Sequence, residues 1–435
     1  MKETARVRRR ILSREAPVSI VGGGYVGLNL GVACVQAGFP VACVDIDPAR
    51  VEELSSGMLT VAAVNERDFR SAFDSGRMTF SVGSEAVASS DVILICVPTP
   101  LRDSVPDLSH VERACGEVAE RLRPGQLVVL ESTTYPGTTD QLVRSILERS
   151  GLVAGKDFLL AYSPERIDPG NEEYTLENTP KIVGGVTPEA TGVAALFYEQ
   201  IVDKVVVVSS CRSAELAKLL ENTFRHVNVA LVNEMAMLCH EMGIDVWEVI
   251  DAAATKPFGF MSFRPGPGVG GHCIPLDPSY LAWQVRRDAG RKFRILEEAQ
   301  DVNAQMPGYV SARIGDALNG RGKAVKESKI MVLGVTYKPD IGDLRESPAL
   351  RVLASLQRRG AAVGFHDPYV DEIAVDGTLV RRTELTQRAM VSADCVAILT
   401  PHTSYDFDWI AEHASLVFDA GNVYGSDRRV NLVRL

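Results

Sequence analysis

The sequence predicts an α/β protein with two doubly wound parallel sheets, joined by a central helical domain with one long spine helix. Apolar runs such as residues 18–21 and 41–44 are typical of buried parallel strands, and each leads into a polar turn and a helical segment. A stretch of about thirty residues after Cys211 has apolar residues at helical spacing and no Pro or Gly before Gly243. A second series of strand and turn patterns begins near Ser328.

Length, charge and cysteine usage narrow the class of protein. The 435 residues correspond to two or three domains at about 150 residues each. The formal net charge of −10 argues against nucleic acid or an anionic membrane as the main partner. No apolar run reaches about 18 residues, so we expect no transmembrane helix. The eight cysteines lack CxxC spacing, and with no export signal we expect reduced thiols in a cytoplasmic protein.

The N-terminal residues 1–16 are basic. They are not followed by an apolar stretch of signal-peptide length. Because chain termini are usually poorly ordered, we expect a solvated, disordered leader over these residues.

A glycine motif lies at the first predicted strand–helix turn. Gly22, Gly24 and Gly27 form G-x-G-x-x-G, which in a Rossmann-like domain permits a tight turn, close approach of a pyrophosphate and close helix packing. Asp45 ends the second strand and would accept hydrogen bonds from a ribose hydroxyl, which favours NAD over NADP. The alternative is a glycine turn without a cofactor. Arg50 either contacts the adenine or a phosphate, or is an exposed helix residue.

A single cysteine stands in a bend rich in glycine and proline, GVGGHCIPLDP, over residues 268–278. Loops carry chemistry more often than cores do, so Cys273 is a candidate nucleophile, with a structural thiol and a metal ligand as alternatives. His272 raises the metal alternative, but no second Cys/His pair stands at zinc spacing, and we expect no bound metal. The backbone N–H groups of residues 266–271 are candidates to bind a diphosphate.

A dinucleotide site combined with a nucleophilic cysteine has a known chemical use. An alcohol is oxidised to an aldehyde, a thiolate adds to give a thiohemiacetal, and loss of a second hydride gives a thioester that water hydrolyses to a carboxylate.

Motifs along the whole chain resemble one enzyme family. GGYVG, CVPTP, ESTTYPGTT, SPERIDPGN, KLLENTFRHVNVALVNEMAM, KPFGFMSFRPGPGVGGHCIPLDPSYLAW and GVTYKPDIGDLRESPAL are similar, in this order, to motifs of nucleotide-diphosphate-sugar 6-dehydrogenases. The resemblance implies an NAD-binding Rossmann-like domain over residues 17–208, a central helical dimerisation domain over 209–310 and a nucleotide-sugar-binding α/β domain over 311–435. It also implies oxidation of the C6 hydroxyl of UDP- or dTDP-glucose, or of UDP-N-acetylglucosamine, to the uronic acid.

The resemblance assigns roles to individual residues. The catalytic residues would be Cys273, Lys218, Asn222, Asp277, Thr133 and Glu165. NAD would contact Gly22, Gly24, Tyr25, Val26, Gly27, Asp45, Arg50, Pro98, Thr99, Thr133 and Arg345. The sugar nucleotide would contact Glu165, Arg166, Lys218, Asn222, Arg264, Gly270 and Lys338, with Arg264 reaching the substrate from the partner subunit as one alternative.

Structural alternatives exist for several of these residues. Lys218 and Asn222 are four residues apart, so they share a helix face that could simply be solvated. Thr133 could cap a turn, and Glu165 could be a surface charge. The basic side chains of the C-terminal domain could likewise be exposed.

The loops GGHCIPLDP and SPERIDPGN favour a subgroup similar to UDP-N-acetylglucosamine 6-dehydrogenases, without determining the hexose or the nucleobase. We expect a homodimer, no nucleic-acid partner and no membrane association. The alternative enzyme class is a two-electron β-hydroxyacid dehydrogenase of the 6-phosphogluconate dehydrogenase-like superfamily, which lacks a cysteine nucleophile and forms one NADH per substrate where the present proposal requires two. A non-catalytic NAD-binding scaffold is the third alternative.

Overall fold

The computed structural model describes residues 2–61, 64–103, 105–168, 170–171, 173–271, 274–427 and 429–435. The chain forms two compact units, one of residues 1–221 with 279–284 and the other of residues 222–278 with 285–435. Most of the expected central domain therefore belongs to one unit with the expected C-terminal domain, while residues 209–221 and 279–284 belong to the first unit. No helix in the described part of the chain is long and apolar enough to cross a membrane.

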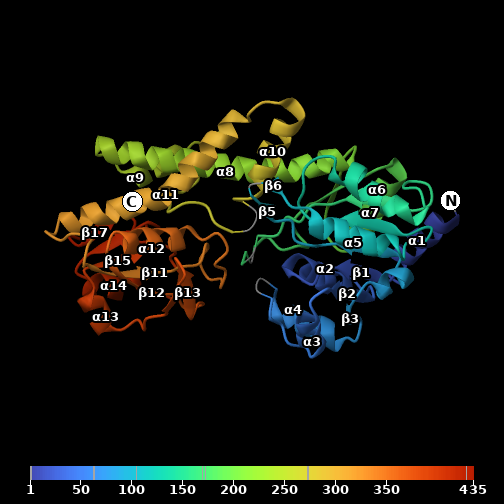
Figure 1. Cartoon of the computed structure of the whole chain (residues 1–435), viewed down its shortest axis with the longest axis horizontal. Coiled ribbons are helices and arrows are strands. Elements are labelled where there is room, and N and C mark those ends of the chain that lie inside the picture. Colours follow the sequence, from blue (N-terminus) through green and yellow to red (C-terminus); the bar gives the residue numbers. More distant parts are fainter. Residues whose placement is uncertain are drawn as a thin grey trace. The chain divides into compact units, whose positions relative to one another are not determined.

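The first unit is built on an eight-stranded sheet, counted over the described residues, in the order β10-β9-β8-β7-β4-β1-β2-β3. Figure 1 labels β1, β2 and β3 of this sheet. Neighbouring strands are parallel except for β8 and β9. The strands are β1 (Val18–Val21), β2 (Val41–Asp45), β3 (Met78–Val82), β4 (Val92–Ile95), β7 (Leu127–Leu130), β8 (Leu159–Tyr162), β9 (Lys181–Gly185) and β10 (Val205–Val207). The chain order reverses between β1 and β4, and ligands bind at such a switch point in open α/β sheets.

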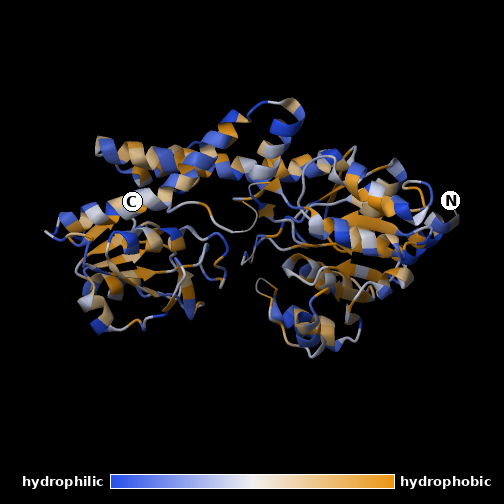
Figure 2. Ribbon diagram, in the orientation of Figure 1, coloured by the Kyte–Doolittle hydropathy of each residue, from blue (hydrophilic) through white to orange (hydrophobic). Residues whose placement is uncertain are grey.

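Helices and a short hairpin complete this unit. The helices are α1 (Lys2–Leu12), α2 (Tyr25–Gln36), α3 (Pro48–Ser55), α4 (Glu66–Asp74), α5 (Ser109–Ala119), α6 (Arg144–Leu147) and α7 (Pro188–Tyr198), and the hairpin pairs β5 (Leu101–Arg102) with β6 (Val105–Pro106). The apolar strands appear orange between bluer helix faces in Figure 2, as expected for strands buried on both sides.

The expectation of a disordered leader is wrong for residues 2–12, which form α1. Val7 and Ile11 lie one turn apart on one face of this helix and are fully buried in the core of the unit. Arg10 Nη1 lies 2.6 Å from Oδ2 of the buried Asp91, and Arg6 also contacts that carboxylate. Arg6 and Arg10, two of the basic residues that suggested a solvated leader, therefore form ion pairs with buried Asp91.

A single helix, α8 (Cys211–Met242), confirms the predicted spine helix. The two compact units divide at Glu221 and Asn222, inside this helix, and not at the expected boundary near residue 208. The reason is that opposite ends of one continuous helix belong to different cores, with Cys211 and Leu219 in a core of the first unit and Val232 and Ala236 in a core of the second.

The second unit contains a five-stranded parallel sheet, counted over the described residues, in the order β12-β11-β15-β16-β17. Its strands are β11 (Lys329–Leu333), β12 (Ala362–His366), β15 (Cys395–Ile398), β16 (Val417–Asp419) and β17 (Leu432–Arg434), with a separate hairpin of β13 (Glu372–Val375) and β14 (Thr378–Arg381). The helices are α9 (Val246–Ala254), α11 (Arg294–Asn319), α12 (Pro348–Arg358), α13 (Gln387–Ser392) and α14 (Phe407–His413), and α10 (Asp277–Ala289) has residues in both units.

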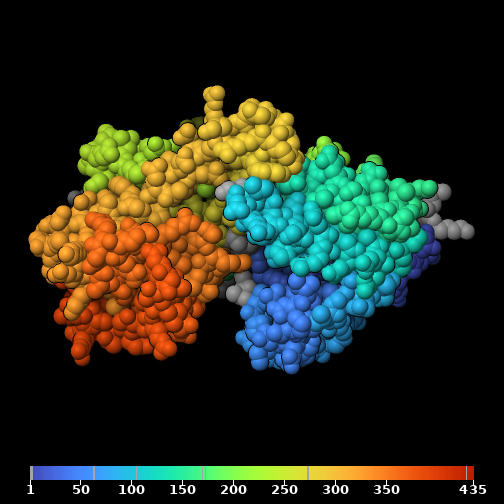
Figure 3. Space-filling view, in the orientation of Figure 1, coloured from blue at the N-terminus to red at the C-terminus, as the bar shows by residue number. Residues whose placement is uncertain are grey.

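Helix α11 joins the expected central and C-terminal domains into one unit. Its residues Met306, Val310 and Ile314 share a buried core with Val352 of α12 and Val332 of β11. In Figure 3 the yellow-orange residues of α11 accordingly form a continuous surface with the orange residues that follow them.

Candidate active site

The glycine motif of the first unit has the geometry of a dinucleotide cradle. Gly22 has a φ of +112°, and a Cβ there would lie 2.5 Å from the carbonyl oxygen of Cys96. A Cβ on Gly27 would lie 2.0 Å from the carbonyl oxygen of Gly22, so only glycine permits this approach of α2 to the turn. A Cβ on Gly24 would meet no atom within 4 Å, which leaves open space where a pyrophosphate would approach.

Asp45 ends β2 beside this cradle. Its buried carboxylate accepts hydrogen bonds from the N–H groups of Gly23 at 2.7 Å and Asp47 at 3.0 Å. Arg50 Nη1 lies 3.2 Å from Asp45 Oδ2, so the arginine forms an ion pair with this carboxylate. Neither of the two expectations for Arg50 foresaw this ion pair.

The other predicted cofactor and water-binding residues follow β4, β7 and β8. Pro98 and Thr99 follow β4, Thr133 follows β7 and Glu165 follows β8, so all four lie at the carboxyl edge of the parallel sheet. The carbonyl oxygen of Thr99 accepts a hydrogen bond of 2.5 Å from the hydroxyl of Tyr280. The structure therefore brings these residues to the same edge as the glycine cradle.

Glu165 is buried and not the surface charge that was its alternative. Its carboxylate accepts hydrogen bonds from the backbone N–H of Ile167 and, at 3.4 Å, from the hydroxyl of Tyr25. Tyr25 and Val26 are half-buried at the start of α2.

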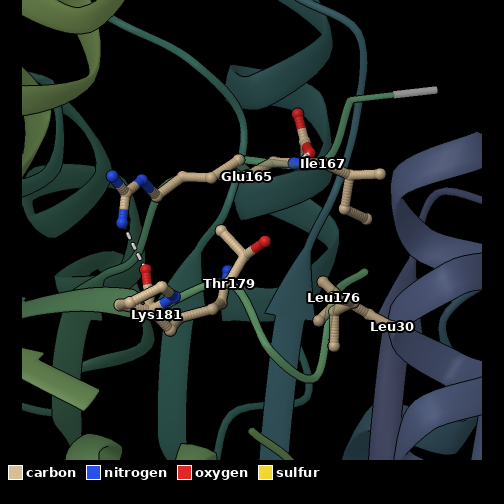
Figure 4. Close-up of a pocket in the computed structure, with 8 residues that line it drawn as sticks. Leu30, Glu165, Ile167, Leu176, Thr179 and Lys181 are labelled. Atoms are coloured by element: carbon tan, nitrogen blue, oxygen red, sulfur yellow. Dashed lines mark hydrogen bonds between the residues drawn. The ribbon is translucent and has the colours of Figure 1, made fainter. Parts of the chain in front are cut away.

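Arg166 follows Glu165 on the same loop but has different partners. It donates to the carbonyl oxygen of Pro180 and lies 2.7 Å from a carboxylate oxygen of Glu221. The small pocket beside it is lined by Leu30, Glu165, Arg166, Ile167, Leu176, Thr179, Pro180 and Lys181. Figure 4 shows Leu30 and Leu176 together on one side of this pocket and Lys181 on the other.

Sequence reasoning missed a buried charged cluster behind this edge. Lys181 Nζ donates to Glu131 Oε2 at 2.6 Å and to the carbonyl oxygen of Pro164 at 3.0 Å, and the hydroxyl of Tyr198 also donates to Glu131. Burial raises the pKa of the Glu131 carboxyl, against the opposing effects of Lys181 and Tyr198. The cluster joins the chain just before Thr133 to the chain just before Glu165. Glu131 directly follows β7 and Lys181 begins β9, and nothing in the sequence indicates that these two residues pair.

The long helix carries two more predicted residues. Lys218 is buried in the part of α8 that belongs to the first unit. Asn222 begins the part that belongs to the second unit, and its Nδ2 donates to Oδ2 of Asp277, the first residue of α10. Asp277 is buried and Asn222 is half-buried, so the two form a partly buried amide–carboxylate pair.

The glycine-rich loop packs against the C-terminal part of its own unit. A Cβ on Gly270 would lie 2.6 Å from Cβ of Tyr337, and Gly271 has a φ of +86° with the Tyr337 ring about 3.0 Å from its Cβ position. The N–H of Gly271 donates to the carbonyl oxygen of Arg345 at 2.9 Å. His272 and Cys273 lie outside the described residues.

Two backbone donors of this loop already have partners in their own unit. The N–H groups of Gly266 and Gly271, which were candidates to bind a diphosphate, donate to Oδ1 of Asn233 and to the carbonyl oxygen of Arg345. Close packing on Tyr337 explains why Gly270 has no side chain, and its expected contact with the substrate stays a prediction.

Lys338 and Arg345 lie on the loop that follows β11, at the switch point of the second sheet. Arg345 is exposed, and its guanidinium forms a two-point ion pair with Asp343 at 2.6–3.0 Å. Two buried side chains fix the backbone of this loop. Asp367 accepts a hydrogen bond from the N–H of Val335 at 2.8 Å, and Nδ1 of His402 accepts one from the N–H of Asp340 at 2.9 Å.

The Asp367–His402 pair is buried. Because His402 Nδ1 accepts a backbone N–H, the neutral ring carries its proton on Nε2, 3.0 Å from Asp367 Oδ2. Burial acts to raise the pKa of Asp367, but hydrogen bonds from His402 and from the backbone outweigh it and hold that pKa below its usual value.

Arg264 is exposed and engaged with α9. Its Nη2 lies 2.6 Å from Asp251, and its guanidinium lies 5.9 Å from the centre of the Trp247 ring. Arg264 thus links the loop that carries it to α9 of the same chain.

Comparison with known proteins agrees with the geometry. Residues 16–202 match the NAD binding domain of the UDP-glucose/GDP-mannose dehydrogenase family, residues 212–305 match its central domain and residues 331–426 match its UDP binding domain. The chain belongs to this family. The resemblance to nucleotide-sugar dehydrogenases and the expected NAD cofactor are thereby confirmed.

Relatives of this chain extend along nearly its whole length. It is 34% identical to UDP-N-acetyl-D-mannosamine dehydrogenase of Pyrococcus horikoshii, over 89% of this chain and 90% of that protein. It is 33% identical to protein CapL of Staphylococcus aureus, over 94% of this chain and 96% of that protein. A solved structure of UDP-D-ManNAc dehydrogenase from Pyrococcus horikoshii superimposes with a TM-score of 0.87 at 32% identity, covering 96% of this chain and 98% of that one.

Proposed function

We propose that this chain oxidises the C6 hydroxyl of a UDP-linked N-acetylhexosamine to the carboxylate with NAD, N-acetylmannosamine being the first candidate sugar. The observation that carries the proposal is the ordered match to NAD binding, central and UDP binding domains of one dehydrogenase family. The names of the relatives favour an N-acetylated sugar. The earlier alternatives, glucose, N-acetylglucosamine and a dTDP-linked sugar, remain predictions to be tested beside it.

The glycine cradle fits NAD. Open space at Gly24, the obligatory glycines at 22 and 27 and the carboxylate of Asp45 provide for a pyrophosphate and a ribose. When bound, NAD⁺ accepts hydride from C6 of the sugar, once in each of two steps. Asp45 would exchange its ion pair with Arg50 for hydrogen bonds from the ribose.

Cys273 supplies the nucleophile in this proposal. The first oxidation removes a hydride and a proton from the C6 alcohol and leaves an aldehyde. The thiolate then forms an S–C6 bond while the aldehyde oxygen takes up a proton, which gives a thiohemiacetal. Loss of the second hydride and of that proton gives a thioester. Water held by Thr133 and Glu165 breaks the S–C6 bond, which releases the carboxylate and regenerates the thiol.

The oxyanions formed along this path need nearby donors. Lys218 would supply a cation, and Asn222 an amide N–H, one helical turn further along α8. Support for the assignment of Asp277 comes from its hydrogen bond with Asn222, which fixes the orientation of the amide. Lys338 and Arg345 are assigned to the diphosphate and sugar because their loop follows β11 at the switch point of the second sheet.

We also propose a homodimer formed through α8. The side chains of Phe224, Leu231 and Leu238 are exposed at intervals of seven residues, which places them on one face of the helix. Met242 on α8 and Phe258 after α9 are exposed as well. An apolar helix face of this kind is typical of an interface between copies. Light scattering at micromolar protein should give the mass of a dimer, and a monomer throughout would contradict the proposal.

The substrate assignment is tested by a panel of nucleotide sugars. UDP-N-acetylmannosamine, UDP-N-acetylglucosamine, UDP-N-acetylgalactosamine, UDP-glucose and dTDP-glucose are each supplied with NAD, and NADH formation is followed by absorbance. We expect the highest kcat/KM with a UDP-N-acetylhexosamine. Turnover confined to UDP-glucose or dTDP-glucose would reject an N-acetylated substrate.

A further inference from the structure

Two loops pack against each other at the switch point of the second sheet. Residues 334–347 follow β11 and residues 399–406 follow β15, and both loops leave the same edge because these neighbouring strands are parallel. A Cβ on Gly334 would lie 2.1 Å from the carbonyl oxygen of Thr400, so the two loops touch directly after their strands. Ligands of open α/β sheets bind outside the carboxyl ends of the strands at such a point.

The imidazole of His402 links the loop after β15 to the loop after β11. The ring is fully buried, and its centroid lies 5.1 Å from that of Tyr369 and 5.5 Å from that of Tyr405. Its Nδ1 accepts a hydrogen bond of 2.9 Å from the backbone N–H of Asp340. Because a backbone N–H can only donate, the neutral ring carries its proton on Nε2, which faces Oδ2 of Asp367 at 3.0 Å. The two ring nitrogens therefore have different roles.

The backbone on either side of Lys338 is fixed by this network. Thr336 Oγ1 donates to the carbonyl oxygen of Lys338 at 3.0 Å, and the N–H of Thr336 donates to Asp367 Oδ2 at 3.3 Å. Two residues after Lys338, the N–H of Asp340 is held by His402. Asp340 has a φ of +63°, in the left-handed region that residues with a Cβ seldom adopt. A conformation of this kind persists only where surrounding contacts maintain it.

We propose that His402 is a positioning residue for the sugar nucleotide: its Nδ1 fixes the N–H of Asp340 and thereby the backbone that carries Lys338. The inference rests on the proposed function, because it takes Lys338 to contact a UDP-linked substrate. Asp340 has a second contact with the loop after β15, since its Oδ1 accepts a hydrogen bond of 2.9 Å from the N–H of Thr403. Loss of the His402 acceptor leaves this second contact to maintain the left-handed conformation, so the loop after β11 becomes less well ordered.

Two substitutions separate the roles of the two ring nitrogens. His402→Asn places an amide oxygen near the position of Nδ1, where it can accept from the N–H of Asp340, but it no longer reaches Asp367. His402→Gln places its amide near the position of Nε2, where it can donate to Asp367, but it leaves the N–H of Asp340 without this acceptor. His413→Asn is the matched control, because His413 is a half-buried histidine of the same unit whose ring contacts the carbonyl oxygen of Trp409 within α14.

UDP is the probe, because its binding requires no turnover. In calorimetric titrations we expect the Kd of His402→Gln for UDP to rise about fivefold, because a hydrogen bond that orders the loop is lost, whereas His402→Asn and His413→Asn should stay within about twofold of wild type. KM for the UDP-sugar should follow the same order, with kcat and KM for NAD within about twofold of wild type. Equal effects of the Asn and Gln variants, or a weaker UDP affinity in His402→Asn than in His402→Gln, would overturn the proposal.

A double-mutant cycle tests whether the effect of His402 passes through Lys338. Lys338→Ala alone should weaken UDP binding, and adding His402→Gln should then change the Kd by less than about twofold, because the positioned side chain is already absent. An unaltered Kd in Lys338→Ala, or a further fivefold loss in the double variant, would contradict the proposal.

Failure of the proposed function has a different signature. A wild-type protein that does not bind UDP rejects the proposed function itself. A wild-type protein that binds UDP, with both His402 variants binding equally well, rejects only the positioning role of His402.

Discussion

At the scale of single residues, the glycines of this chain have two different uses. Gly22 and Gly27 are required because a Cβ at either position would collide with a backbone carbonyl oxygen. Gly24 faces open space. Gly270 and Gly271 let a loop lie directly against Tyr337. Both sites bring backbone close to a neighbour, and at the first site Gly24 also borders open space.

Gly27→Ala should destabilise the protein and weaken NAD binding together. The new Cβ would lie 2.0 Å from the Gly22 carbonyl oxygen, and overpacking of this kind costs on the order of 1–3 kcal/mol. Gly116→Ala is the control, because a Cβ there meets nothing within 4 Å inside α5 and should stabilise by up to about 1 kcal/mol. Urea unfolding and NAD titration measure both effects, and a Gly27→Ala protein with wild-type values would show that the turn tolerates a side chain.

His226 should make stability depend on pH. Burial holds its pKa in the folded protein below the ordinary value of 6.5, so the unfolded chain binds the proton more readily. Stability contributed by the neutral ring is therefore present above pH 6.5 and is lost as pH falls from that value through the lower folded pKa. Urea unfolding between pH 5 and 8 should show a shallower decline towards low pH for His226→Phe than for wild type, and parallel curves would contradict the assignment.

At the scale of elements, the N-terminal helix shows that a high density of basic residues is not sufficient to predict a disordered segment. The density of arginine in residues 1–16 favoured a solvated leader, but Val7 and Ile11 give α1 a buried face and Arg10 pairs with buried Asp91. The spine helix was predictable because nothing in its sequence interrupts the helical spacing. The antiparallel pairing of β9 with β8 was not predictable, because an apolar run has no direction.

Ile11→Ala should destabilise the first unit, since truncating a buried isoleucine costs about 2–5 kcal/mol. Leu12→Ala provides the control, because Leu12 is the next residue along and is exposed; its cost should stay within about 0.5 kcal/mol. The midpoint of thermal unfolding reports both variants. Equal effects of the two substitutions would mean that α1 is not part of the core in solution.

The candidate site was predictable where a motif has its own geometry and not where distant residues meet. The glycine turn, Asp45 and the residues after β4, β7 and β8 follow from strands that end at one edge of a sheet. The Glu131–Lys181 pair joins residues fifty positions apart, and the His226–Asn303 contact joins residues seventy-seven apart. A single sequence contains no signal for such pairings, so only the structure supplies them.

At the scale of the whole molecule, the residues assigned to the proposed reaction are divided between the two compact units. The glycine cradle and Asp45 belong to the first unit, whereas the loop before Cys273, the Asn222–Asp277 pair and the loop of Lys338 and Arg345 belong to the second. Helix α8 is continuous through both units and carries Lys218 in one and Asn222 in the other. We therefore expect one chain to complete two oxidations at one carbon through a thioester.

The most direct test counts NADH and identifies the product for wild type and Cys273→Ala. With the preferred UDP-sugar as limiting substrate, wild type should form two NADH per sugar and the uronic acid as the sole product by mass spectrometry. Cys273→Ala should still bind NAD in a fluorescence titration but form no uronic acid. One NADH per sugar with wild type, or sustained formation of the uronic acid by Cys273→Ala, would contradict the account.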